Sequence, residues 1–223
     1  MKVSIIIPTK NEEQNIRDII EKVKKFGDEI LVVDGRSTDK TPTIVKNMGI
    51  KLIVDNGLGK GDGIRCSIRE VSGEILVFID ADGSHDPEDI PKLIEPIKKG
   101  EADLVIASRR TGGSDELYGD FNKFLRETGS HIITLMINHR FKKNLTDSQN
   151  GFRAIKKEVA KNLDLKEDIT TIEQEMLIKT LKKGYRVTEM PSHEYERKFG
   201  SSVIKLSMVW WRYIYSCIKY LYF

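Results

Sequence analysis

The chain has 223 residues, of which 39% are hydrophobic and 32% are charged, and its formal net charge at pH 7 is +3. This composition is typical of a globular protein and argues against disorder, and so small a net charge does not by itself indicate a nucleic-acid partner. Cys66 and Cys217 lie far apart and match no metal-binding spacing, which favours a reducing compartment such as the cytoplasm.

Short apolar runs rich in β-branched residues alternate with amphipathic segments along the chain. The runs show no apolar-polar alternation, which is typical of strands covered on both faces of a sheet. They lie at 3–7, 29–34, 51–55, 74–80, 103–108 and 186–191, and helical spacing marks 16–23, 43–48, 64–71, 87–99 and 121–137. This order predicts an α/β fold with a mostly parallel central sheet flanked by helices.

Carboxylates gather where the fourth predicted strand ends. Asp80 and Asp82 are separated by one residue in the sequence VFIDADGSHDP, so both side chains can turn toward one point in the loop. A pair of carboxylates offers hard oxygen ligands to Mg²⁺ or Mn²⁺, and such ions usually also bind substrate phosphates. Asp86, before Pro87, is predicted to cap the next helix. We expect His85 to be solvated rather than to be a further metal ligand.

Two further loops at the same predicted edge carry polar side chains. Asp34 ends the second strand, where a carboxylate can hydrogen-bond a ribose or a base, although turn chemistry alone also explains it. The stretch GLGKGDGIR has glycines at 57, 59, 61 and 63 but matches neither GxxxxGK[ST] nor GxGxxG. We interpret it as a flexible loop that lets Lys60 or Arg65 approach an anion.

The stretch 201–223 is rich in aromatic residues. Such a helix suits a membrane interface, with its cations toward lipid phosphates, whereas internal charges exclude a membrane-spanning helix. Packing of this helix on the core is the alternative. The apolar helical face comprises Ile204, Met208, Trp211, Tyr215, Ile218 and Tyr222, and the basic stripe beside it comprises Lys205, Arg212 and Lys219.

Together these loops resemble the family 2 glycosyltransferases and, within them, the dolichyl-phosphate hexose synthases. The resemblance runs over nearly the whole chain and rests on IIIPTKNEE, VVDGRSTDKT, GKGDGIR, DADGSHDP, ASRR, DSQNGFRAI and ERKFGSSVIKL, in that order. It implies a nucleotide-sugar-binding GT-A type fold over residues 1–200, followed by an amphipathic helix at 201–223, and Mg²⁺ or Mn²⁺ as cofactor.

The resemblance also implies roles for individual residues. Ser84 and Gly35 depart from the family pattern, in which glutamine and a second aspartate are commoner at these positions. Catalysis would involve Asp82, Arg109 and Arg126, and the acceptor phosphate would be held by Arg126, Arg197 and Lys205. The nucleotide sugar would contact Pro8, Lys10, Glu12, Asp34, Lys60, Asp80, Ala81 and Asp82, and the metal ion would be bound by Asp80 and Asp82.

The implied activity is an inverting, metal-dependent transfer of a hexose from a nucleotide-diphosphate sugar to a polyprenyl or dolichyl phosphate. The enzyme would lie peripherally at the cytosolic face of the membrane. A phosphate acceptor is already an anion and needs cations that position it, whereas a hydroxyl acceptor needs a carboxylate base. The alternative is a soluble family 2 glycosyltransferase with a hydroxyl acceptor, for which Asp147, Glu173 and Glu175 are candidate bases.

Two other classes of protein fit the sequence less well. A sugar-phosphate nucleotidyltransferase carries its glycine-rich loop directly after the first strand, where this chain has PTKNEE. A nucleotide-sugar binding module without catalysis does not need both Asp80 and Asp82. No nucleic-acid partner is expected.

Overall fold

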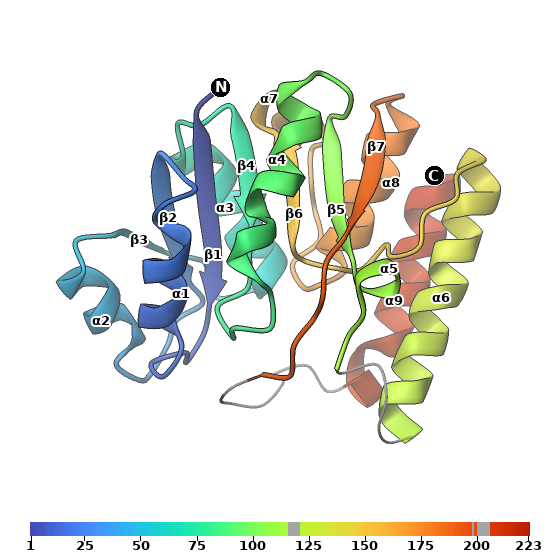
Figure 1. Cartoon of the computed structure of the whole chain (residues 1–223). Helices are drawn as coiled ribbons and strands as arrows, with labels where there is room; N and C mark the ends of the chain where they lie inside the picture. Colours follow the sequence, from blue (N-terminus) through green and yellow to red (C-terminus); the bar gives the residue numbers. More distant parts are fainter. Residues whose placement is uncertain (116–120, 198, 200–205) are drawn as a thin grey trace.

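The computed structural model describes residues 1–115, 121–197, 199 and 206–223, with residues 121–126 and 206–209 described by their backbone alone. In this part of the chain the strands form one seven-stranded sheet in the order β3-β2-β1-β4-β6-β5-β7, with helices on both faces (Figure 1). The strands are β1 (Val3–Thr9), β2 (Glu29–Asp34), β3 (Lys51–Val54), β4 (Ile75–Phe78), β5 (Leu104–Ser108), β6 (Arg153–Lys156) and β7 (Val187–Pro191). The helices are α1 (Ile16–Val23), α2 (Thr41–Asn47), α3 (Lys60–Glu70), the 3₁₀ turn η1 (Pro87–Asp89), α4 (Ile90–Lys98), α5 (Arg109–Gly112), α6 (Phe121–Phe141), α7 (Lys157–Asn162), α8 (Ile172–Lys182) and α9 (Leu206–Tyr222).

The sheet is parallel except at β6, which pairs antiparallel with both β4 and β5. The mostly parallel sheet predicted from the sequence is therefore confirmed. Each predicted apolar run coincides with a strand, and the predicted helices lie within a few residues of α1, α2, α3, α4 and α6. The sequence pattern did not reveal β6, because the run 153–156 is short and follows a polar loop.

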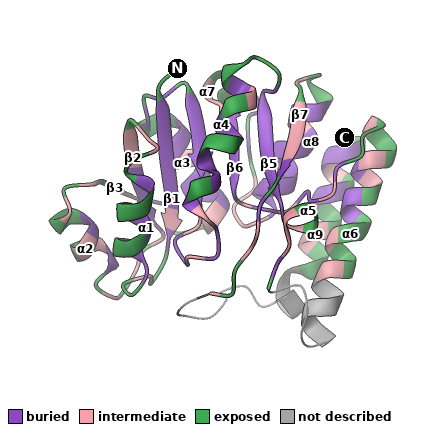
Figure 2. Ribbon diagram, viewed as in Figure 1, coloured by how far each residue is buried: buried purple, intermediate pink, exposed green. Residues whose placement is uncertain are grey.

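Two apolar cores fill the space on the two faces of the sheet. Successive residues of a strand point to opposite faces, so Ile5 and Ile7 belong to one core and Ile6 to the other. One core packs against α1, α2 and α4, and the other packs against α3, α7, α8, α6 and α9. The strands are consequently buried along most of their length (Figure 2).

From Lys60 onward the glycine-rich stretch 57–65 is helical and not a flexible loop, so that interpretation was wrong for this part. The helix begins at Lys60, and the backbone N–H groups of Gly61 and Asp62 donate to the carbonyl oxygen of Asp168 at 2.8 and 3.2 Å. A Cβ atom at Gly61 would lie 2.3 Å from the carbonyl oxygen of Glu167. Glycine is therefore needed for this close approach. Because a carbonyl already accepts from these N–H groups, they are not free to bind a phosphate, and Lys60 is fixed on a helix.

Helix α9 combines a buried side with an exposed side. Cys217, Tyr220 and Leu221 are buried against α8 and α6. Within the described residues, no helix is long and apolar enough to cross a membrane. The large exposed apolar side chains concentrate on α6 and α9, and we call this set the aromatic face. It comprises Ile132, Leu135, Trp210, Trp211, Ile214, Tyr215, Ile218, Tyr222 and Phe223.

Candidate active site

The polar loops of the chain meet at one edge of the sheet. The strands other than β6 are parallel, so their carboxyl ends and the loops that follow open on the same side. Because β6 runs the other way, it is the loop before β6, residues 147–152, that reaches this edge. The antiparallel strand therefore adds late polar residues to a site built from the first half of the chain.

Lys60 lies between two carboxylates at this edge. Its Nζ atom is 2.7 Å from Asp80 Oδ1 and 3.0 Å from Glu173 Oε1. Burial acts to raise the pKa of the Asp80 carboxyl, but the charge of Lys60 and its hydrogen bond outweigh burial and lower this pKa overall. Burial acts to lower the pKa of Lys60, and the two carboxylates raise it above its ordinary value. Asp80 is thus an anion held in place by Lys60, which is itself held by Glu173 at the start of α8.

The loop before β6 covers this cluster with its backbone. A Cβ atom at Gly151 would lie 2.6 Å from Lys60 Nζ and 3.1 Å from Asp80 Oδ2. Arg153 is 1% exposed, and its Nη1 donates to the carbonyl oxygen of Glu173 at 2.8 Å, while its Nε donates to a carbonyl of its own loop at 2.9 Å. Burial lowers the pKa of Arg153 to about 10. This buried arginine ties the loop before β6 to the start of α8.

Asp82 faces a second cation. Its Oδ1 accepts hydrogen bonds from the backbone N–H and the hydroxyl of Ser84, at 3.1 and 2.7 Å. Its Oδ2 lies 3.2 Å from Arg197 Nη2. Glu12 belongs to the same group, because the charge of Asp82 acts on it. Burial raises the pKa of Glu12, the hydrogen bond from Asn15 lowers it, and the charge of Asp82 raises it. Arg197 therefore sits among carboxylates that come from two different loops.

Asp80 and Asp82 supply the oxygen ligands that hard divalent cations prefer. Within the described residues, no cluster of three or more His, Cys, Asp or Glu side chains has the geometry of a metal site. A cation here would take its other ligands from substrate phosphates and water, which is the usual way in which Mg²⁺ binds. The pair therefore fits a metal that arrives together with a phosphorylated substrate.

His85 is buried, so the expectation of a solvated side chain was wrong. It is 5% exposed, and its ring stacks on Phe152 with the ring centroids 5.1 Å apart. Its Nε2 lies 4.0 Å from Asp80 Oδ2. Burial lowers the pKa of His85, although the charge of Asp80 raises it in part, so the ring is neutral at pH 7. The histidine packs the Asp80 loop against the loop before β6.

The ends of β1 and β2 continue the edge on one side of Asp80. Pro8 is half-buried in β1, and Lys10 is exposed just beyond it. Asp34 is 2% exposed, and its Oδ2 accepts from the backbone N–H of Ser37 at 3.1 Å. Its Oδ1 is buried without a hydrogen-bond partner among the described residues. An unsatisfied buried carboxylate oxygen is uncommon, and this one lies at the edge of the sheet where the loops gather.

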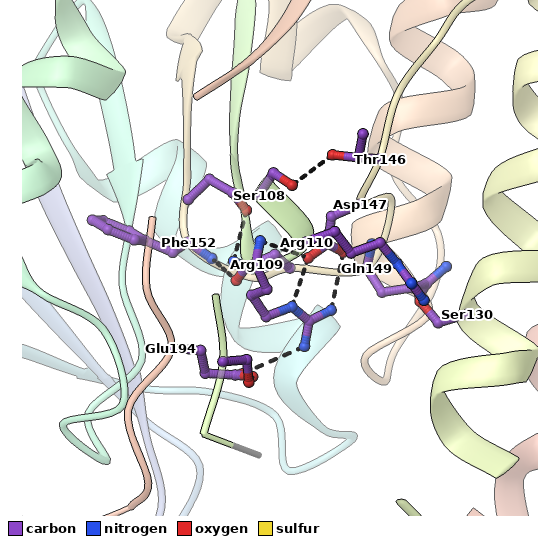
Figure 3. Close-up of polar contacts among 12 residues, drawn as sticks. Ser108, Arg109, Arg110, Ser130, Thr146, Asp147, Gln149, Phe152 and Glu194 are labelled. Carbon is purple, nitrogen blue, oxygen red and sulfur yellow. Dashed lines mark hydrogen bonds and ion pairs between the residues drawn. The ribbon is translucent and has the colours of Figure 1, made fainter. Parts of the chain in front are cut away.

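On the other side of Asp80, the guanidinium of Arg109 is held by two carboxylates (Figure 3). Its Nε is 2.6 Å from Asp147 Oδ2, its Nη2 is 3.0 Å from Asp147 Oδ1, and its Nη1 is 3.4 Å from Glu194 Oε1. The backbone N–H of Asp147 in turn donates to Glu189 at 2.8 Å. Burial acts to raise the pKa of Asp147, but Arg109 lowers it overall. This network joins the ends of β5 and β7 to the loop before β6.

Comparison with known proteins assigns the chain to a protein family. The family model described as glycosyl transferase family 2 matches residues 4–164. The chain belongs to this family. An uncharacterized protein, MJ1222, of Methanocaldococcus jannaschii is 33% identical over 215 residues, covering 91% of this chain and 87% of the relative. The dolichol-phosphate mannosyltransferase of Pyrococcus furiosus is 32% identical over 231 residues, covering 99% of this chain.

The solved structures agree with the fold predicted for this glycosyltransferase. The glucosyl-3-phosphoglycerate synthase of Mycobacterium tuberculosis, crystallised with Mn²⁺, UDP and glucosyl-3-phosphoglycerate, superposes with a TM-score of 0.80 at 21% identity, over 99% of this chain and 80% of that one. The GT-A type fold is thereby confirmed. The chain spans 64% of the length of the Pyrococcus relative, so the acceptor named for that protein enters below only as a proposal.

The structure brings together most of the residues predicted for the glycosyltransferase site. Around the metal pair lie Glu12, Lys60 and Arg197, with the buried Ala81 between Asp80 and Asp82. Two predicted residues cannot be placed in this way. The backbone of Arg126 lies in α6 but its side chain is outside the description, and Lys205 falls outside the described residues.

Several residues of the glycosyltransferase site were missed at the level of sequence. Glu173 was considered only as a base, yet it is the buried partner of Lys60, and Glu194 is a second partner of Arg109. The signal for Glu173 was a charged residue inside the apolar pattern of α8, where only a paired carboxylate is tolerated. The partners of Arg153 are backbone carbonyls, which a sequence pattern does not reveal.

Proposed function

We propose that this family 2 glycosyltransferase moves a hexose from a nucleotide-diphosphate sugar to a polyprenyl or dolichyl phosphate at a membrane surface, by an inverting, metal-dependent reaction. The observation that carries the choice of acceptor is the aromatic face of α6 and α9. The N-terminal ends of both helices lie on the same side of the molecule as the carboxyl ends of the parallel strands (Figure 1). A lipid whose chain lies along this face would present its phosphate toward the site.

The donor would be bound through its diphosphate near Asp80 and Asp82. These carboxylates would hold Mg²⁺ or Mn²⁺, ions with which the neighbouring structures were crystallised. A bound divalent cation stabilises negative charge on a leaving phosphate. The chain's own contribution is to fix Asp80 through Lys60 and to set Asp82 by the two hydrogen bonds from Ser84.

The acceptor is proposed to be an anion because the candidate bases are already paired. A hydroxyl acceptor needs a carboxylate that is free to take a proton, and the structure holds each of the three candidates in an ion pair. They are Asp147 with Arg109, Glu173 with Lys60, and Glu175 with Lys179. The cations required for an anionic acceptor would be Arg126, Arg197 and Lys205, as the resemblance implies.

Peripheral binding to the cytosolic face of a membrane follows from the same proposal. Trp and Tyr are favoured at membrane interfaces, and on α9 the aromatic face is flanked by Arg212 and Lys219, whose charges suit lipid phosphates. A vesicle-binding assay tests this part by itself. We expect Trp211→Ser with Tyr215→Ser to abolish co-sedimentation with anionic vesicles, whereas Leu58→Ser, at an exposed apolar residue before α3, leaves it unchanged.

The activity is tested by a transfer assay in detergent with dolichyl phosphate as acceptor. Radiolabelled UDP-glucose, UDP-N-acetylglucosamine and GDP-mannose are supplied in turn, each with Mn²⁺ or with EDTA. We expect metal-dependent label in the organic phase with one donor, and loss of that label in Asp82→Asn with the fold retained. The exposed Glu70→Gln is the matched control. If a donor is bound and slowly hydrolysed but never labels the lipid, the acceptor is not a lipid phosphate.

A further inference from the structure

Asp55, directly after β3, is a buried carboxylate with one unused oxygen. The residue is 6% exposed, and its Oδ1 accepts from the backbone N–H of Gly57 at 2.8 Å. Within the described parts of the chain its Oδ2 accepts no hydrogen bond, and it faces two glycines. A Cβ atom would lie 3.7 Å from Oδ2 at Gly35 and 3.3 Å from it at Gly63. Because these positions lack side chains, no Cβ atom crowds Oδ2.

Arg36 contacts the backbone of Asp55. Its Nε donates to the carbonyl oxygen of Asp55 at 3.4 Å, and a Cβ atom at Gly57 would lie 2.9 Å from that Nε. Gly57 also has a φ of 82°, so two constraints require glycine here. The turn after β3 therefore holds the Arg36 side chain against the backbone of Asp55, close enough for its charge to lower the pKa of the Asp55 carboxyl.

The position of this pair indicates which part of a donor it would meet. This step rests on the proposed function, in which the diphosphate lies near Asp80 and Asp82 after β4. Toward β6 and β5 the edge is filled by the network of Arg109 and Asp147. In the other direction the order is β4, β1, β2, β3, and strands lie about 4.8 Å apart. The span from β4 to β3 suits an extended nucleoside diphosphate, which places the base near Asp55.

We propose that Asp55 and Arg36 select a guanine base in the donor. Guanine presents two adjacent donors, the N1–H and the N2 amino group, next to the acceptor O6. A carboxylate accepts from both donors, and an arginine donates to O6 or N7. Uracil offers one N–H between two carbonyl oxygens, so one of its oxygens would face the carboxylate. Burial raises the pKa of the Asp55 carboxyl, the Gly57 N–H lowers it and the charge of Asp62 raises it, so further N–H donors would stabilise the anion.

The test measures binding of GDP, inosine diphosphate and UDP to the whole chain by titration calorimetry with Mn²⁺. Inosine diphosphate differs from GDP only by lacking the N2 amino group. In the unmutated protein we expect GDP to bind about 10-fold more tightly than either other nucleotide, which is within the discrimination that one bidentate pair gives. In Asp55→Asn the preference for GDP over inosine diphosphate should disappear. Asp164→Asn, at a residue whose φ of 48° asparagine tolerates, is the control.

The outcomes separate this inference from the proposed function. Binding of UDP as tight as that of GDP refutes guanine selection but leaves a nucleotide-sugar site in place. Equal binding of GDP and inosine diphosphate to the unmutated protein shows that the N2 amino group is not read, and refutes it independently of any mutant. If none of the three nucleotides binds, both the inference and the proposed donor site are wrong.

Discussion

Replacement of Lys60 by methionine should destabilise the protein, because it leaves two carboxylates without their shared cation. Methionine has a similar length and fits the same path, so the main change is the loss of charge. Removing one partner of a buried ion pair costs about 3–5 kcal/mol. The side chains of Lys60 and Asp80 are 21% and 28% exposed, whereas that of Glu173 is 3% exposed. Solvent screens part of the effect, so we expect a loss of about 2–3 kcal/mol in the free energy of unfolding.

Urea denaturation followed by circular dichroism measures this loss at a fixed m-value. The double variant Lys60→Met with Glu173→Gln removes the buried carboxylate as well, and should recover at least half of the stability. Lys22→Met, in an exposed ion pair with Asp18, is the control and should change little. If Lys60→Met is as stable as the unmutated protein, or if the double variant recovers nothing, the cluster does not hold the site together.

The ion pair of Lys60 with Asp80 predicts that the stability difference between the unmutated protein and Lys60→Met depends on pH. Asp80 has a lowered pKa in the folded protein, so its contribution is present above its unfolded pKa of about 3.9 and is lost as the pH falls through the folded value. Lys60 has a raised pKa, so its contribution is complete below its unfolded pKa of about 10.4 and is lost as the pH rises through the folded value. The difference between the unmutated protein and Lys60→Met should thus be largest between about pH 5 and pH 10.

Three further predictions concern packing, metal binding and acid stability. Gly61→Ala should lower the free energy of unfolding, measured in urea, by about 1–3 kcal/mol, because its Cβ would lie 2.3 Å from a backbone oxygen. Gly129→Ala, with open space around it in α6, is the control and should stabilise the protein slightly. Arg197→Gln should bind Mn²⁺ about 3-fold more tightly, because Arg197 no longer competes with the metal for Asp82. Electron paramagnetic resonance measures the affinity for Mn²⁺, and an unchanged affinity would refute this competition. Burial acts to raise the pKa of Glu29, but hydrogen bonds from two serines lower it to about 2. Glu29→Gln should therefore lose about 1–2 kcal/mol in the free energy of unfolding at pH 7, and this loss should disappear as the pH falls through about 2.

The sequence predicted correctly which carboxylates lie at the edge of the sheet where apolar runs mark the strand ends. Asp34, Asp80 and Asp82 end or closely follow apolar runs. A residue at the carboxyl end of a parallel strand lies at the ligand-binding edge of the sheet, independently of the rest of the sequence. The same logic failed for the stretch around Lys60. Its glycines indicated a loop, but they serve the close approach of α3 to the backbone at 167–169, a contact between segments about a hundred positions apart.

The sequence by itself determined the alternation of strands and helices, the parallel sheet and the carboxylates at its edge, because hydrophobic periodicity and turn chemistry are local. Only the tertiary structure decided which charges meet. The pairing of Lys60 with Glu173, of Arg109 with Asp147 and Glu194, and of Arg197 with Asp82 depends on the antiparallel β6 and on the return of the chain after β7. Charge pairing acts through space over a few ångströms, and the distance along the chain carries no information about it.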